Sequence, residues 1–162
     1  METLFLQDED PTKFRRRIPS SLTVLYQLAL GLEFIHKMGF VHRNLKPENV
    51  LIWVDPIKGD VLMKWADLGL SKSVNERPGS YSVSVWLAPE ILKLLDEDFS
   101  QSESGTTSTK IETIQSDVFT EGLVFGYFLL KGVHLFGLRH QIHSNILENN
   151  PVNLDSKFII KK

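Results

Sequence analysis

Three short polar segments in a fixed order constrain this chain more than any other feature of its sequence. The first covers residues 42–49 and reads HRNLKPEN, and a β-prone run at residues 50–54 follows it directly. The second, Asp67-Leu68-Gly69, follows another β-prone run at residues 61–65, and the third is Leu87-Ala88-Pro89-Glu90. Taken alone, the second segment would indicate only a turn, because Asp and Gly favour turn conformations. Three segments in this order argue against an accidental match.

In order and spacing, these segments match the catalytic loop, the magnesium-binding loop and the end of the activation segment of protein kinases. The chain therefore resembles the C-terminal lobe of a eukaryotic Ser/Thr protein kinase over most of residues 22–137. A narrower resemblance lies in Ser116-Asp117-Val118-Phe119 and in residues 132–137, GVHLFG. It is to the inositol-requiring kinase/endoribonuclease of the unfolded protein response and to its relative, the oligoadenylate-activated ribonuclease. Leu135 departs from that pattern, which usually has Pro there.

The resemblance implies a mainly α fold, a kinase-like large lobe with short β-hairpins at the catalytic and magnesium loops and with the small lobe absent. Apolar spacing of three and four residues independently predicts a helix from about residue 22 to near Gly39. The runs at 50–54 and 61–65 flank turn residues, which favours a hairpin with a longer loop. A further helix, capped by Ser116, is apolar around most of its girth and is expected to be deeply buried.

The domain organisation follows from the same resemblance. Residues 1–20 are interpreted as a hinge-like N-terminal segment, and residues 21–162 as a partial kinase domain. Residues 96–110 are rich in Ser, Thr and acidic side chains without apolar periodicity, so we expect a disordered surface insertion there. No Gly-rich phosphate loop precedes His42, which favours a truncated kinase sequence.

Four residues suit the nucleotide side of phosphoryl transfer, which requires metal-bridged phosphates and compensation of developing negative charge. By resemblance, Asp67 would offer carboxylate oxygens to Mg²⁺, and Asn49 would offer a neutral oxygen to a second ion. Lys46, which is typical of the Ser/Thr class, would lie near the transferred phosphoryl group, and Leu51 would form the apolar floor beneath adenine. ATP and Mg²⁺ are thus the implied cofactors, but without a small lobe we do not expect tight ATP binding by this chain alone.

The catalytic pattern fails at Asn44, which stands where the family has the Asp that accepts the proton of the substrate hydroxyl. An amide cannot accept that proton. General-base assistance is typically worth about 10²–10⁴-fold in rate, so the substitution should cripple transfer. Val83 points the same way, because the family usually has a Thr there that bonds to the catalytic Asp and Lys. Arg43 would clamp a phosphorylated activation segment by resemblance, or be a solvated basic residue, while His42 has a structural role in this family.

Composition excludes several other classes. Lys and Arg total 18 against 20 Asp and Glu, so no strong field attracts nucleic acid and no direct nucleic-acid site is expected. The chain has no cysteine, which excludes a disulfide framework and a thiolate metal site. The N-terminus lacks the features of a signal peptide, and the apolar stretches at 22–35 and 123–130 are too short to span a bilayer. These features predict a cytoplasmic protein without a membrane segment, or the cytosolic face of the endoplasmic reticulum if the chain is part of a longer sensor.

The favoured hypothesis is a kinase-like domain that is catalytically impaired, a pseudokinase, and acts in signalling by binding a protein partner or a second copy of itself. The alternative is an ATP- and magnesium-dependent protein serine/threonine kinase of the unfolded-protein-response sensor family, with an incomplete sequence and its small lobe upstream. A third possibility is a fragment that does not fold stably.

Overall fold

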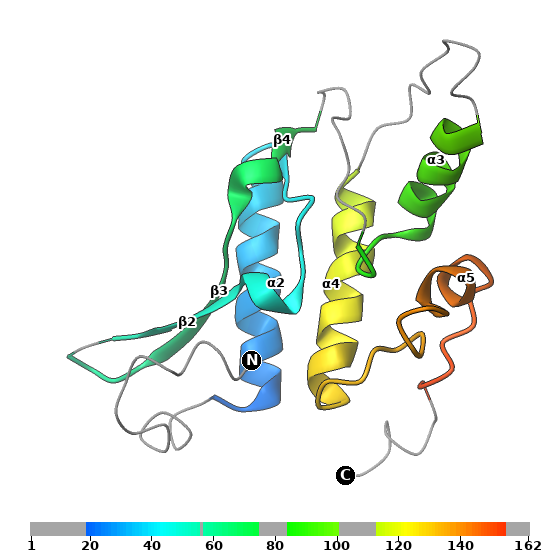
Figure 1. Ribbon diagram of the computed structural model, residues 1–162. Helices are drawn as coiled ribbons and strands as arrows, with labels where there is room; N and C mark the ends of the chain where they lie inside the picture. Colours follow the sequence, from blue (N-terminus) through cyan, green and yellow to red (C-terminus); the bar gives the residue numbers. More distant parts are fainter. Residues whose placement is uncertain (1–18, 56, 75–83, 101–112, 155–162) are drawn as a thin grey trace.

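Two long helices form the centre of the described part of the chain. The computed structural model describes residues 19–55, 57–74, 84–100 and 113–154. Helix α2 (Ser21–Lys37) lies beside α4 (Ile114–Leu129), and the two helices are in contact (Figure 1). A hairpin of β2 (Val50–Val54) and β3 (Val61–Trp65) packs on the far side of α2. On the opposite side of α4 lie α3 (Pro89–Ser100) and α5 (Ile142–Leu147), which contact each other.

Helix α2 begins and ends where the sequence predicted. The hydroxyl of Ser20 accepts a hydrogen bond from the Thr23 backbone N–H at 3.2 Å, which satisfies one free donor of the first turn. After the last turn, Gly39 adopts a φ of +81°, a left-handed conformation that favours glycine. The buried side chains are Val24, Leu28 and Leu32, so the apolar spacing matches the core face at Leu28 and Leu32. It does not at Leu22, the first residue of the predicted helix, which is 78% exposed.

The predicted hairpin is confirmed. Strands β2 and β3 pair antiparallel from Val50 opposite Trp65 to Val54 opposite Val61. In the turn, the carboxylate of Asp55 accepts two backbone hydrogen bonds, from Ile57 at 2.8 Å and Lys58 at 2.9 Å. These bonds favour the charged carboxylate and lower the pKa of Asp55.

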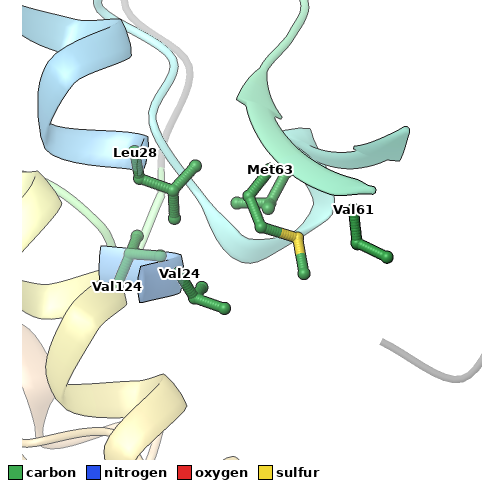
Figure 2. Close-up of a cluster of buried hydrophobic side chains, with 6 residues drawn as sticks. Val24, Leu28, Val61, Met63 and Val124 are labelled. Carbon is green, nitrogen blue, oxygen red and sulfur yellow. The ribbon is translucent and has the colours of Figure 1, made fainter. Parts of the chain in front are cut away.

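The main apolar cluster joins α2, the hairpin and α4. Figure 2 shows Val24 and Leu28 of α2 facing Val61 and Met63 of the hairpin, with Val124 of α4 beside them. Full burial of an aliphatic side chain of this size is worth about 1.5–3 kcal/mol. The cluster therefore fixes the hairpin against both helices, and with it the two loops that flank the hairpin.

A second, smaller sheet is formed by the strand before and the strand after those loops. Strand β1 (Phe40–Val41) pairs antiparallel with β4 (Lys72–Ser73), with Val41 opposite Lys72. Between these strands lie two short 3₁₀ helices, η2 (Pro47–Asn49) and η3 (Leu68–Leu70). The described part of the chain is thus mainly α with two small antiparallel sheets, which agrees with the mainly α character and the short hairpins of the predicted fold class. Within it, no helix has both the length and the apolar character needed to cross a membrane.

Two predictions about helices need correction. Helix α4 begins at Ile114 with Thr113 as its N-cap, and Ser116 accepts from the Thr113 backbone N–H at 3.4 Å instead of capping the helix itself. The prediction that α4 is deeply buried is correct only for part of the helix, because Val118 is 53% exposed and Leu129 is 55% exposed. Several of its buried positions are polar or charged. Two of them bind other segments: Asp117 accepts from the backbone at residues 42 and 43, and Thr120 donates to the Trp86 carbonyl.

The first residues of the expected insertion are helical in the structure. Residues 96–100 continue α3, which runs from Pro89 to Ser100. Once the preceding turns are formed, each further residue adds a helical hydrogen bond at little extra cost, so a polar composition does not end a helix by itself. Residues 101–110 of the expected insertion, the hinge-like segment up to residue 18, and Val83 lie outside the described residues.

Candidate functional site

The predicted catalytic loop is fixed at its start by Asp117, in the first turn of α4. One carboxylate oxygen accepts from the His42 backbone N–H at 2.7 Å, and the other accepts from the Arg43 backbone N–H at 2.9 Å. The ring of His36 makes a third contact with the carboxylate at 2.9 Å. Asp117 is only 3% exposed, and a carboxylate is tolerated at such a place only when hydrogen bonds replace its water. Asp117 therefore ties the loop to the core.

His42 is a buried structural residue, as expected from the sequence. Its side chain is fully buried, and this burial lowers the pKa of the ring, which favours the neutral form. Its Nδ1 accepts the Asn44 backbone N–H at 3.3 Å, which orients the following residue. His42 also packs edge-on against Trp65 of the hairpin, with ring centroids 6.1 Å apart.

Arg43 and Asp67 both adopt left-handed backbone conformations, with φ of 68° and 62° respectively. Residues other than glycine hold such conformations only where their surroundings fix them. The Arg43 guanidinium donates to the Leu70 carbonyl at 3.3 Å, and the Ser71 hydroxyl donates to the His42 carbonyl at 3.2 Å. The predicted catalytic and magnesium loops thus bind each other directly. A clamp by Arg43 on a phosphorylated segment stays a prediction.

Three of the predicted site residues come together. The Asn44 side-chain amide donates from Nδ2 to Oδ2 of Asp67 at 2.8 Å, which joins positions 23 residues apart in sequence. The Asn49 amide donates from Nδ2 to the Asn44 carbonyl at 2.7 Å. The other Asp67 oxygen, Oδ1, accepts the Gly69 backbone N–H at 3.4 Å. Asn44 is therefore the link between the two proposed cation-binding residues.

The other two predicted site residues are Lys46 and Leu51. Lys46 is half-buried and lines a cleft of about 1100 Å³ together with Glu48. Leu51 is 44% exposed on β2, so its side chain offers an apolar surface that a nucleotide base would cover. Its role beneath adenine stays a prediction.

The donor set fits Mg²⁺ only in part. Asp67 contributes one carboxylate and Asn49 one amide oxygen, and the described residues contain no group of three or more His, Asp or Glu side chains suited to a metal ion. Mg²⁺ is usually held by one or two carboxylates and completes its shell with water and substrate phosphates. Asp67 and Asn49 therefore fit a magnesium ion that arrives with nucleotide phosphates, and they fall short of a cage that binds the ion alone.

Part of the cleft lining is an aromatic wall, which no sequence pattern predicted. Trp86 stacks edge-on against Tyr127 with ring centroids 5.3 Å apart, and the His134 ring lies 4.8 Å from Trp86. Burial lowers the pKa of His134, which favours its neutral form. Arg139 and His143 also line the cleft. The wall combines residues from three separate segments, so no local pattern could reveal it.

A second buried carboxylate, Glu121, was also missed. It lies one helical turn after Asp117 and is 9% exposed. Burial raises its pKa to about 7, although a hydrogen bond with Trp65 and the nearby His36 partly oppose the rise. Its Oε1 has no hydrogen-bond partner among the described residues. Two carboxylates in an otherwise apolar helix were the available signal, because a charged residue is seldom buried without a specific partner.

Comparison with known proteins identifies the family of this chain. The protein kinase domain model matches residues 12–159, so the chain belongs to the protein kinase family. It is 33% identical to the sensor for unfolded proteins in the ER ire1 of Schizosaccharomyces pombe, over 80% of the chain and 13% of the relative. It is 36% identical to the human serine/threonine-protein kinase/endoribonuclease IRE2, over 79% of the chain and 13% of the relative.

One relative differs in its described activity. The chain is 32% identical to the inactive serine/threonine-protein kinase/endoribonuclease IRE1-like of Arabidopsis thaliana, over 82% of the chain and 23% of that relative. The chain thus spans less than a quarter of the length of each of these three proteins. The resemblance predicted from the motifs, to protein kinases and to the inositol-requiring kinase/endoribonucleases, is confirmed.

Proposed function

We propose that this chain is a kinase domain impaired in phosphoryl transfer, a pseudokinase that acts in signalling by binding. The observation that carries the proposal is the side chain of Asn44, which stands where protein kinases have the catalytic Asp. Its amide nitrogen points at Asp67 and donates a hydrogen bond there. An amide has no basic site for the substrate proton, so a loss of about 10²–10⁴-fold in rate is expected from this residue.

The nucleotide side of the site retains its groups. In the proposal, Asp67 and Asn49 contact Mg²⁺, Lys46 contacts the phosphates of ATP, and Leu51 lies beneath adenine. The ion would neutralise charge on the phosphates and bridge them to the protein. These residues support nucleotide binding without efficient transfer, because binding requires charge complementarity while transfer also requires an oriented, deprotonated hydroxyl.

The cleft beside the catalytic loop is the surface that we propose for a protein partner. Lys46 and Glu48 contribute charges of both signs to its lining, and Trp86 and Tyr127 contribute aromatic surface. Aromatic side chains beside a few charged groups are typical of the central part of protein interfaces. A second copy of the chain is the other occupant to test. The name of the Schizosaccharomyces pombe relative, a sensor for unfolded proteins in the ER, supports a place at the endoplasmic reticulum. The cytosolic face of that membrane is part of the proposal and follows from the family resemblance.

The second candidate is an active, magnesium- and ATP-dependent protein serine/threonine kinase. The observation that favours it is the close arrangement of Asn49 and Asp67 around the loop that carries Lys46. This candidate requires another group to take the role of the missing base.

A transfer assay separates the two candidates. The full chain is incubated with Mg²⁺, radiolabelled ATP and a generic Ser/Thr-containing acceptor protein, beside the variant Asp67→Ala. We expect no incorporation above that of Asp67→Ala, because transfer lacks its base, while a fluorescent ATP analogue reports whether nucleotide binds. Incorporation that Asp67→Ala or Lys46→Ala removes would favour the active kinase and overturn the proposal.

A further inference from the structure

We propose that Asn44 is a positioning residue. Its amide holds the Asp67 carboxylate in its observed orientation, which would otherwise require a bound divalent cation. The Asn44–Asp67 hydrogen bond would make the conformation of Asp67 independent of a cation and would weaken cation binding. This inference deepens the proposed function and rests on it, because it assigns a task to the residue that has lost the role of base.

The hydrogen bonds of Asp67 supply the first argument. Its Oδ2 accepts from Asn44 Nδ2 at 2.8 Å, and its Oδ1 accepts from the Gly69 N–H at 3.4 Å, so both carboxylate oxygens already have a donor. Asp67 also has φ 62° and ψ 70°, a left-handed conformation that needs support from its surroundings. The shorter of its two side-chain hydrogen bonds comes from Asn44.

The anchoring of Asn44 supplies the second argument. Its backbone N–H donates to the fully buried ring of His42 at 3.3 Å, and its carbonyl accepts from Asn49 at 2.7 Å. His42 is in turn fixed through its own N–H to Asp117 at 2.7 Å. Because the backbone of Asn44 is fixed on both sides, its amide reaches Asp67 from a rigid base, and little order is lost when the bond forms.

The chemistry of the amide supplies the third argument. With a carboxylate at position 44, two negatively charged acceptors would face each other across this short distance, and neither has a hydrogen to donate. Like charges so close together repel unless a cation lies between them. The amide is uncharged and carries an N–H, so it replaces repulsion with attraction. A cation that approached Asp67 Oδ2 would have to displace this N–H, which lowers its affinity.

The test measures cation binding in the absence of nucleotide, with Mn²⁺ as the probe. The full chain is compared with Asn44→Asp, Asn44→Ala and the control Asn149→Asp, by calorimetric titration and by thermal unfolding in EDTA and in Mn²⁺. Asn149 is an exposed residue in a left-handed conformation after α5, so Asn149→Asp adds the same charge away from the site.

We expect the unsubstituted chain and Asn149→Asp to unfold at nearly the same temperature with and without Mn²⁺. Asn44→Asp should be less stable in EDTA, should regain stability in Mn²⁺ and should bind Mn²⁺ at least about tenfold more tightly. Asn44→Ala should bind Mn²⁺ more tightly than the unsubstituted chain and less tightly than Asn44→Asp, because it frees Oδ2 without adding a charge.

Two results would overturn the inference. If Asn44→Ala binds Mn²⁺ more weakly than the unsubstituted chain, Asn44 is itself a cation ligand through its Oδ1. If Asn44→Asp and Asn149→Asp respond alike to Mn²⁺, Asn44 does not control the site. Should Asn44→Asp fail to fold under either condition, Asn44→Ala decides alone.

These measurements contain no transfer step, so their failure is distinct from that of the proposed function. Incorporation in the transfer assay would refute the loss of activity and leave the hydrogen bond to Asp67 untouched. Conversely, if the chain lacks transfer activity and its Mn²⁺ affinity does not change when Asn44 is substituted, only the positioning role is refuted.

Discussion

Two buried carboxylates one turn apart on α4 are expected to have opposite effects on the stability of the folded chain. Asp117 accepts from two backbone N–H groups and contacts His36, whereas Glu121 has an oxygen without a hydrogen-bond partner among the described residues. Their exposed fractions are similar, 3% and 9%. Burial alone therefore does not decide what a charge contributes. The hydrogen-bond donors around a buried carboxylate decide its contribution to stability. Of these two carboxylates, only Asp117 has donors from the predicted catalytic loop.

The largest expected effect is that of Asp117→Ala. The substitution leaves the buried N–H groups of His42 and Arg43 without an acceptor, and unsatisfied buried groups cost about 1–3 kcal/mol each. We expect a loss of about 3–5 kcal/mol in the free energy of unfolding, measured by urea denaturation, since breaking a buried charged contact costs about that much. A loss below about 1 kcal/mol would contradict the anchoring role of Asp117.

Glu121→Gln should have the opposite effect and raise the free energy of unfolding. Because burial raises the pKa of Glu121 from 4.5 to about 7, the native state binds this proton more tightly than the unfolded chain does. Stability should therefore fall as the pH rises from about 4.5 to about 7, and the full penalty should remain above pH 7. Glu121→Gln removes the charge, so we expect it to stabilise the chain by about 1–3 kcal/mol at pH 8 and by much less at pH 5.

Urea denaturation at both pH values checks this prediction. The unsubstituted chain should lose stability between the two conditions, and Glu121→Gln should lose less. Equal pH dependence of the two chains would show that Glu121 is already charged in the native state at pH 5.

The difference between the two carboxylates also marks the limit of sequence reasoning. Helix α2 and the hairpin could be predicted because their signals are local: apolar spacing with Ser20 before the helix, and two β-prone runs around a turn. The partners of Asp117 could not, because His42 lies 75 residues earlier in the sequence. In the sequence, Asp117 belongs only to a segment that resembles the family, and Glu121 belongs to no motif.

The candidate site shows the same limit. The motifs were enough to select Asn44, Asn49 and Asp67, and the structure brings these three together. No pattern of residue types could indicate that the Asn44 amide points at Asp67, because that orientation depends on the buried contacts of His42. The start of α4 was misplaced for a local reason, since Thr113 and Ser116 are both suitable caps only three residues apart.

His36→Ala should cause a loss of stability of intermediate size, and it further tests the comparison between Asp117 and Glu121. His36 is one of the three contacts of Asp117, at 2.9 Å, and it also lies near Glu121. Its removal leaves the two backbone donors in place, so we expect a loss of about 1–2 kcal/mol, clearly less than for Asp117→Ala. Urea denaturation of the double variant His36→Ala with Asp117→Ala should give less than the sum of the two losses, because both remove the same contact. Additive losses would show that His36 stabilises the chain by another route.

The smallest expected effect is that of Ser116→Ala, which separates the capping of α4 from the anchoring by Asp117. Ser116 is buried beside Asp117, but within the described residues its hydroxyl makes only long contacts, 3.4 Å to the Thr113 backbone N–H and 3.4 Å to the Thr113 hydroxyl. Contacts of that length are weak, so we expect a loss of about 0.5–1 kcal/mol in thermal or urea unfolding. The backbone bonds from His42 and Arg43 to Asp117 should survive, and the amide hydrogens of these two residues should exchange as slowly as in the unsubstituted chain. Fast exchange at His42 in Ser116→Ala would mean that the first turn of α4, and not the carboxylate alone, fixes the loop.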